Sequence, residues 1–497
     1  MKRKITILPL NKTIFVEQGE TLLNILAQNG YTISAPCGGQ GVCGKCKVQI
    51  ITNEKELKNG VLQTVCACKT RIETDITVFL FKQEGKGLDL FQKIKMEGER
   101  EGLGIALDIG TTTLAACLID LRSGQILGKT SCLNPQAVFG ADVLSRIKAC
   151  QDGKLPLLQK VILNKTEWII KELSMGRPIQ ELVVSANTTM LHLFLGVNPE
   201  SIGVAPFYPV FTETQYCFGK QLGLSATKVR LLPSVSGYIG SDITAGLVAC
   251  SIDQTPNSVL FIDVGTNGEI VFSHQGQLYG ASTAAGPALE GASIECGLGG
   301  VEGAIDKVYM SDDELLFTTI GNVEAKGICG SGLIDLISIL LKEDLIDENG
   351  TWNDESDSRL FSKLKDEKLY LTDSVYISQK DIRQFQLAKA AIMAGIETIL
   401  YESKVEIEKI ETLYIAGGLG YYLNVENAVN VGLLPMNLLS KIKLVGNTSL
   451  QGAIMCMMKQ EYQEKIENVS RQAKIIELSC SKYFRDAYID NISFMGE

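Results

Sequence analysis

The sequence predicts an α/β protein that consists of a small N-terminal domain and a larger, internally duplicated region. From Gly104 onward, apolar runs typical of buried strands alternate with helix-like runs, which is the pattern of a sheet covered by helices. In this region the strand-to-turn motif Asp-x-Gly-Thr occurs twice, first at Asp108 and again at Asp263. Duplication over so long a distance indicates two similar half-domains.

The N-terminal domain begins with residues 4–16, which alternate as two short strands around a turn. Residues 21–29 then place Leu22, Ile25 and Leu26 on one face of a helix that ends at Gly30. Residues 46–51 and 75–81 supply further strands. We therefore expect the first domain to span residues 1–82.

A glycine-rich loop after this helix carries Cys37, Cys43 and Cys46 with C-x5-C-x2-C spacing. Glycines allow tight turns and aim backbone N–H groups at cluster sulfurs. The fourth thiolate is expected from the following strand, where Cys66 and Cys68 both qualify and Cys68 is preferred for the run that follows it. A zinc knuckle is the alternative, because Cys43 and Cys46 share C-x2-C spacing. The domain resembles 2Fe-2S ferredoxins, which implies a β-grasp fold and a cluster that carries single electrons.

Residues 83–103 are rich in glycine and charge and are expected to form a flexible linker. A coil of that length reaches about 25 Å, which would allow a small domain to swing. The rest of the chain, 104–497, is expected to form the duplicated region, with half-domains at about 104–257 and 258–497.

The two Asp-x-Gly-Thr loops predict a phosphate site. A carboxylate there can hold hydrated Mg²⁺, while the glycine and hydroxyls offer donors to phosphate oxygens. The residues expected to face phosphate are Gly110, Thr111, Thr112, Thr113, Gly265, Thr266, Asn267 and Gly268. A third turn, after the strand at Tyr414, contains Gly417, Gly418 and Gly420. The alternative is that these are ordinary strand-to-turn boundaries.

This order of elements resembles the acetate and sugar kinase, chaperone and actin (ASKHA) superfamily, with its RNase H-like, actin-like ATPase fold. The resemblance implies that the loops face each other across an ATP cleft and that the third turn admits the adenosine. Asp108 and Asp263 would act there, with Asp242, Glu269 and Glu290 as further carboxylates for metal or water. Asp242 could equally cap the helix that follows it.

Composition excludes several classes of function. The formal net charge of −10 and the lack of long basic clusters disfavour a nucleic-acid partner. No apolar run approaches the ~18 residues that would span a membrane. Fourteen cysteines without an export signal favour the cytoplasm. The Walker motif is absent, and two histidines offer no His-based centre.

Across nearly the whole chain, the combination of these domains resembles reductive activators of corrinoid proteins. The resemblance implies ATP-dependent transfer of an electron from the 2Fe-2S cluster to an inactive Co(II) corrinoid protein, which regenerates Co(I) for methyl transfer. It also implies an upstream electron donor, and a homodimer is one possible assembly. Two alternatives remain: a redox-sensing kinase or ATPase, and an ATP-dependent chaperone of a corrinoid protein that performs no reduction.

Overall fold

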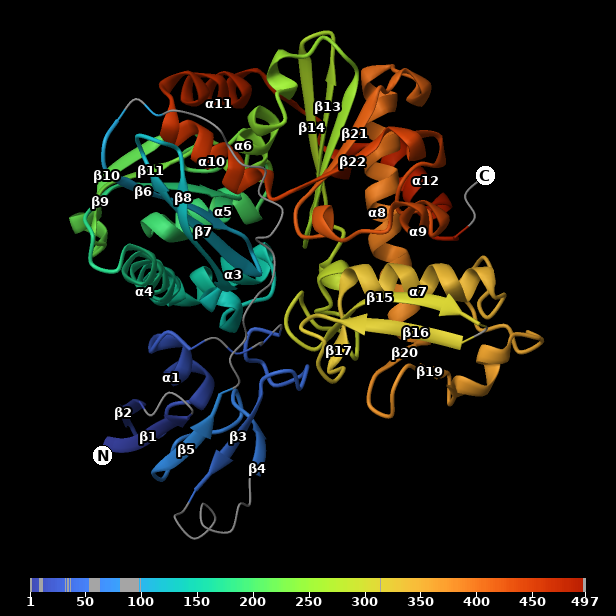
Figure 1. Ribbon diagram of the computed structural model, residues 1–497, viewed down its shortest axis with the longest axis horizontal. Helices are drawn as coiled ribbons and strands as arrows, with labels where there is room; N and C mark the ends of the chain where they lie inside the picture. The colour runs from blue at the N-terminus through green and yellow to red at the C-terminus, as the bar shows by residue number, and fades with distance from the viewer. Residues whose placement is uncertain are drawn as a thin grey trace.

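The computed structural model describes residues 2–8, 12–31, 33, 35, 37–52, 63–80, 98, 100–312 and 314–494. Most of the expected linker, residues 83–103, lies outside this set. The N-terminal domain lies beneath the first half-domain, and the second half-domain stands beside the first (Figure 1). No helix in the described part of the chain is long and apolar enough to cross a membrane.

The N-terminal domain is a five-stranded sheet in the order β2-β1-β5-β3-β4, with one helix packed against it. The helix buries Leu22, Ile25 and Leu26, the face predicted from their spacing. This arrangement confirms the β-grasp prediction. The element bounds are β1 (Lys2–Leu8), β2 (Lys12–Glu17), α1 (Leu22–Gln28), β3 (Lys47–Ile51), β4 (Gln63–Cys66) and β5 (Ile76–Phe79).

Two six-stranded sheets confirm the predicted duplication. Their orders are β10-β11-β9-β6-β7-β8 and β22-β21-β12-β13-β14-β23. In each sheet an antiparallel meander of three strands is extended by a strand that runs parallel to its first member, β9 beside β6 and β21 beside β12. The first sheet comprises β6 (Leu103–Ile109), β7 (Thr113–Asp120), β8 (Ile126–Leu133), β9 (Ile179–Ala186), β10 (Gln215–Phe218) and β11 (Ala226–Leu231). The second comprises β12 (Val259–Val264), β13 (Gly268–His274), β14 (Gln277–Thr283), β21 (Thr412–Ala416), β22 (Ile442–Gly446) and β23 (Lys474–Ile475).

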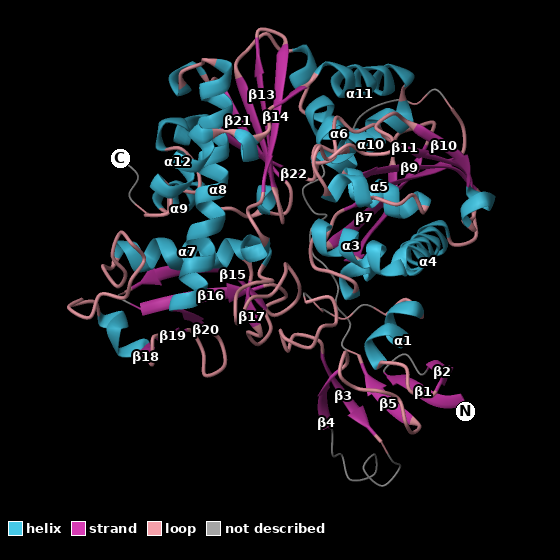
Figure 2. Ribbon diagram, turned by 180° about the vertical axis from the view of Figure 1, so that it is seen from behind, coloured by secondary structure: helices cyan, strands magenta, loops and turns pink. Residues whose placement is uncertain are grey.

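Helices cover both sheets (Figure 2). In the first half-domain they are α3 (Val143–Ala149), α4 (Leu155–Ser174), α5 (Thr188–Leu195) and α6 (Ser241–Ala249). Later in the chain come α7 (Gly330–Lys342), α8 (Gln379–Ser403), α9 (Val425–Asn430), α10 (Thr448–Met458), α11 (Gln460–Gln472) and α12 (Lys482–Asp490). Helices α10 and α11 are separate, because Lys459 is extended at their junction.

Helix α10 follows the last long strand of the second half-domain but packs on β6 and β9 of the first. It also packs against α6, and this contact requires glycine. A Cβ on Gly452 would lie 2.2 Å from the carbonyl oxygen of Ala245. The two helices therefore approach each other at backbone distance and connect the half-domains.

A further unit is inserted in the second half-domain. It contains β15 (Ala304–Ser311), β16 (Glu314–Thr319) and β17 (Gly327–Ile328), with α7 packed against β15. Within residues 344–378, β19 (Lys368–Tyr370) pairs with β18 (Leu364–Lys365) on one side and with β20 (Tyr376–Ser378) on the other. Trp352, Leu360 and Leu369 anchor this segment in the core.

The N-terminal domain is packed against the first half-domain. Helix α1 contacts α4 and the short helix η1 (Pro135–Val138). Buried residues of both domains, including Leu23 and Val138, belong to one continuous apolar cluster. In this structure the domain is therefore docked.

Candidate functional site

The cysteine loop brings its thiols together in two pairs. Cys37 Sγ lies 3.2 Å from Cys43 Sγ, and Cys46 Sγ lies 3.2 Å from Cys68 Sγ. Two pairs fit a cluster with two irons, each of which takes two thiolates. This pairing of the thiols fits the predicted cluster.

The two candidates for fourth ligand occupy different places. Cys66 ends β4 and pairs with Lys47 of β3, whereas Cys68 lies in the turn that follows, where its sulfur meets Cys46. In the loop, burial raises the pKa of Cys37, but hydrogen bonds from the backbone and side chain of Cys43 and from the backbone N–H groups of Val42 and Gly41 outweigh it, and the pKa falls to about 7. Donors that favour a thiolate suit a metal ligand.

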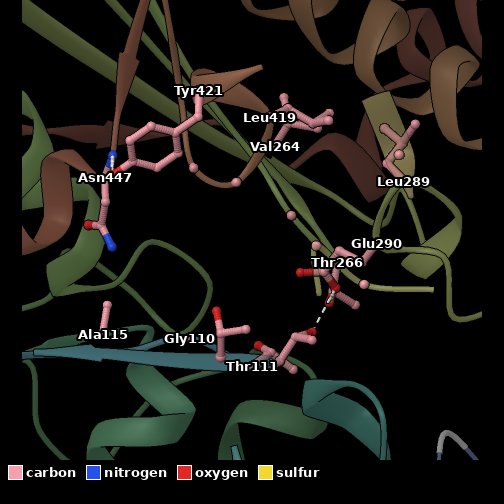
Figure 3. A pocket seen from close by; sticks show the side chains of 18 of the residues that line it. Gly110, Thr111, Ala115, Val264, Thr266, Leu289, Glu290, Leu419, Tyr421 and Asn447 are labelled. Atoms are coloured by element: carbon pink, nitrogen blue, oxygen red, sulfur yellow. Dashed lines mark hydrogen bonds between the residues drawn. The ribbon is translucent and has the colours of Figure 1, made fainter. Parts of the chain in front are cut away.

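A cleft between the half-domains is formed by the expected loops. Residues 110–113, which follow β6, line one wall of a cavity of about 300 Å³, and residues 264–267, which follow β12, line another. In Figure 3, Asn447 and Tyr421 lie across the cavity from Glu290. The third turn adds Gly417 and Gly418. The cleft is therefore built from both copies of the repeated motif.

Glu290 connects the two phosphate loops. Its Oε2 accepts a hydrogen bond from Thr112 Oγ1 at 3.0 Å and a second from Thr266 Oγ1 (Figure 3). Burial raises the pKa of Glu290, and the two hydroxyl donors counteract this effect. One carboxylate thus holds a hydroxyl from each half-domain.

Asp108 is held by residues from the far end of the chain. Its Oδ2 accepts from Asn447 Nδ2 at 2.7 Å, and its Oδ1 accepts from the Ser449 hydroxyl at 2.7 Å. Both donors belong to the start of α10. The crossing of α10 onto the first half-domain therefore orients the first carboxylate of the cleft.

Several carboxylates lie together in the cleft and raise one another's pKa. Burial raises the pKa of Asp242 to about 8, and the charges of Asp263 and Asp108 act in the same direction. Burial and then Asp108 and Glu290 raise the pKa of Asp263 to about 7. The pKa of Glu269 is well above its usual value for the same reasons. Such a group of carboxylates would attract a divalent cation such as Mg²⁺.

Most predicted cleft residues line the cavity, but two glycines do not. Gly268 begins β13, where a Cβ would meet Thr283 and Ile392, and Gly420 packs its turn against Gly446. Asp242 lines the cavity in the first turn of α6, whose N-cap is Gly240, so the alternative of Asp242 as the N-cap is wrong.

Sequence reasoning missed several polar residues of the site. Arg146 is fully buried and donates to the Thr111 carbonyl at 2.5 Å, and Asn187 Nδ2 donates to the Thr111 hydroxyl at 3.1 Å. Asn447, which donates to Asp108, is another site residue that the loop motifs did not predict. Its place before Thr448 and Ser449, at a helix start that follows a strand, is the signal that could have identified it.

Comparison with known proteins places these features in context. Residues 5–73 match the 2Fe-2S iron-sulfur cluster binding domain, residues 103–255 the RACo middle region, and residues 257–497 the C-terminal ASKHA domain of RACo. The fold and these matches define a class in which a 2Fe-2S domain is joined to an ASKHA domain. The chain thus carries a 2Fe-2S domain followed by the RACo middle region and the RACo C-terminal ASKHA domain, and the three matches together extend over most of its length.

Relatives extend over most of the chain. The corrinoid activation enzyme RamQ of Eubacterium limosum is 29% identical over 98% of both chains. The Co(II) methylated amine-specific corrinoid protein reductase of Methanosarcina barkeri is 26% identical over 79% of this chain and 77% of that one. The solved structure of a reductive activator for corrinoid, iron-sulfur protein superposes with a TM-score of 0.74 at 26% identity and covers 99% of this chain and 98% of that one.

Proposed function

We propose that this protein is an ATP-dependent reductive activator of a corrinoid protein. The observation that carries the proposal is the presence of a paired-thiol cluster site and a carboxylate-lined cleft in one chain that matches the RACo middle region and C-terminal domain. When bound, the 2Fe-2S cluster would supply one electron, which converts Co(II) to Co(I). The partner is a corrinoid protein of a methyltransferase system, and an upstream donor restores the electron.

The cluster ligands in this proposal are Cys37 and Cys43 on one iron and Cys46 and Cys68 on the other. Each pair already has its sulfurs within 3.2 Å. Neighbouring backbone N–H groups stabilise negative charge on Cys37, whose pKa is lowered.

In the cleft, Thr112 and Thr266 would donate to phosphate oxygens, while Asp108, Asp242, Asp263 and Glu269 would hold hydrated Mg²⁺ or orient water. In this structure both threonine hydroxyls donate their hydrogen bonds to Glu290. Phosphate binding would take over these donors. ATP favours reduction only if it binds one arrangement of the half-domains better than the other.

The proposal is tested by mixing the pre-reduced protein with a Co(II) corrinoid protein and following Co(I) absorbance with and without Mg-ATP. We expect Co(I) to form only with Mg-ATP. An intact cluster that yields no Co(I) in the presence of Mg-ATP would overturn the proposal. Phosphoryl transfer to a small molecule, independent of the oxidation state of the cluster, would instead identify a kinase.

A further inference from the structure

Lys45 lies inside the cluster loop, between Cys43 and Cys46, and points out of its own domain. Its Nζ donates to the carbonyl oxygens of Ile294 at 2.8 Å, Glu295 at 2.9 Å and Gly297 at 3.3 Å. The ammonium group of a lysine has three N–H donors, so these three carbonyl oxygens satisfy all of them. We call the three carbonyls the seat of Lys45. The cluster loop is therefore fastened to the second half-domain through one side chain.

The seat is held in place by α8 and the strand before it. The backbone N–H of Glu295 donates to Asp381 Oδ1 at 2.7 Å, and the Tyr376 hydroxyl donates to Glu295 Oε2 at 2.9 Å. Asp381 is fully buried and takes part in the capping box of α8. The carbonyls that receive Lys45 thus belong to a fixed turn beside two carboxylates.

The seat forms the middle of a segment whose two ends line the cleft. We call residues 289–301 the strap. Leu289 and Glu290 at its start and residues 298–301 at its end line the cavity. Glu290 also receives the hydroxyls of both phosphate loops. A change at the cleft therefore acts directly on the segment that holds Lys45.

The cluster loop contacts the first half-domain as well. Gly38 packs so closely on Phe139 that a Cβ there would lie 3.0 Å from the Phe139 carbonyl oxygen. The next carbonyl, of Gly140, accepts from Arg146 Nε at 3.0 Å, and Arg146 also holds the Thr111 carbonyl of the first phosphate loop. One short loop thus contacts both half-domains, each at a place connected to its own phosphate loop.

We propose that Lys45 is a positioning residue that latches the cluster loop across the two half-domains, and that nucleotide in the cleft releases this latch. Rotation of one half-domain against the other changes the separation of Phe139 and the strap, so the loop cannot keep both contacts. The inference rests on the proposed function in that it takes the cleft to bind nucleotide. By linkage, removal of the latch must change nucleotide affinity as much as nucleotide changes latching.

The test compares Lys45→Met with Lys69→Met, which removes the same charge from an exposed lysine next to Cys68. The cluster's visible spectrum shows whether each variant is folded and loaded. We expect only Lys45→Met to increase the radius of gyration by X-ray scattering and to bind Mg-AMPPNP more tightly by calorimetry, about five-fold or more. If Lys45→Met had the same radius of gyration and the same affinity for Mg-AMPPNP as Lys69→Met, the latch would be overturned.

A second measurement needs no variant. In the wild-type protein with its cluster, Mg-AMPPNP should increase hydrogen exchange of the amides in residues 37–46 and leave those of α4 unchanged. Unchanged or slower exchange in residues 37–46 would overturn nucleotide-driven release.

Failure of the inference is distinguishable from failure of the proposed function. Wild-type protein that reduces the corrinoid protein with Mg-ATP, while Lys45→Met matches Lys69→Met, would overturn the latch alone. Wild-type protein that binds no nucleotide would overturn both.

Discussion

Asn447 donates a hydrogen bond to Asp108 at 2.7 Å, although 339 residues separate them in the sequence. The same side chain caps α10 by accepting from the Leu450 N–H at 2.8 Å. One amide therefore begins the helix that connects the half-domains and orients the first carboxylate of the cleft.

Asn447→Ala should lower both stability and nucleotide affinity. Loss of a cap costs about 1 kcal/mol in the free energy of unfolding, and Asp108 loses a donor that stabilises its charge. Asn424→Ala is the matched control, because Asn424 caps α9 and does not line the cleft. Urea unfolding and Mg-AMPPNP calorimetry should show a stability loss in both variants and weaker binding only in Asn447→Ala. If Asn447→Ala and Asn424→Ala bound Mg-AMPPNP with equal affinity, the role of Asn447 in orienting Asp108 would be contradicted.

Replacement of the two candidate cysteines should have opposite effects on the cluster. Cys66→Ser should retain the visible spectrum, whereas Cys68→Ser should abolish or distort it, because only the Cys68 sulfur lies beside Cys46 Sγ. Absorption spectra of both reconstituted variants decide the matter, and the reverse result would assign the ligand to Cys66.

When Mg²⁺ is absent from the buffer, ionisation of the cleft carboxylates should lower the free energy of unfolding as the pH rises. The pKa values of Asp263 and Asp242, about 7 and about 8, lie above their ordinary value of 3.8, so the folded chain holds more protons than the unfolded chain between these limits. The contribution of these two carboxyl groups to the free energy of unfolding is full below pH 3.8 and is lost as the pH rises through about 7 and then about 8. Urea unfolding across this range should show a smaller decline in Asp242→Asn than in wild type.

The exposed Asp357 offers a control, since Asp357→Asn should follow the wild-type curve. Mg²⁺ should reverse the trend, because the cation binds the ionised carboxylates and displaces their protons. A decline of equal size in Asp242→Asn and wild type would show that the cleft carboxylates do not cause it.

Gly452→Ala should separate the crossing helices. The added Cβ would meet the Ala245 carbonyl oxygen at 2.2 Å, a backbone atom that can move only with its helix. Overpacking of this kind costs about 1–3 kcal/mol in the free energy of unfolding. Gly128→Ala is the comparison, since its Cβ would first meet Leu173 at 3.4 Å, an ordinary contact. Equal urea midpoints for the two variants would refute the close crossing.

Much of the fold could be predicted because its signals are local. The helix at Leu22–Gln28 follows from apolar spacing, and the two half-domains follow from the repeat of Asp108 at Asp263. Contacts between distant segments carry no such signal. The hydrogen bond from Asn447 to Asp108 arises only when α10 packs against the first sheet, and the burial of Arg146 arises only when α3 packs against α5. The seat of Lys45 likewise depends on the docking of two domains.

The placement of α10 has a consequence for biosynthesis. Because this helix completes the first half-domain and supplies both donors to Asp108, the N-terminal 446 residues form an unfinished cleft while they leave the ribosome. The β-grasp domain can close much earlier, since its strands end at Phe79. A nascent chain would therefore be able to acquire its metal cluster well before it can respond to nucleotide.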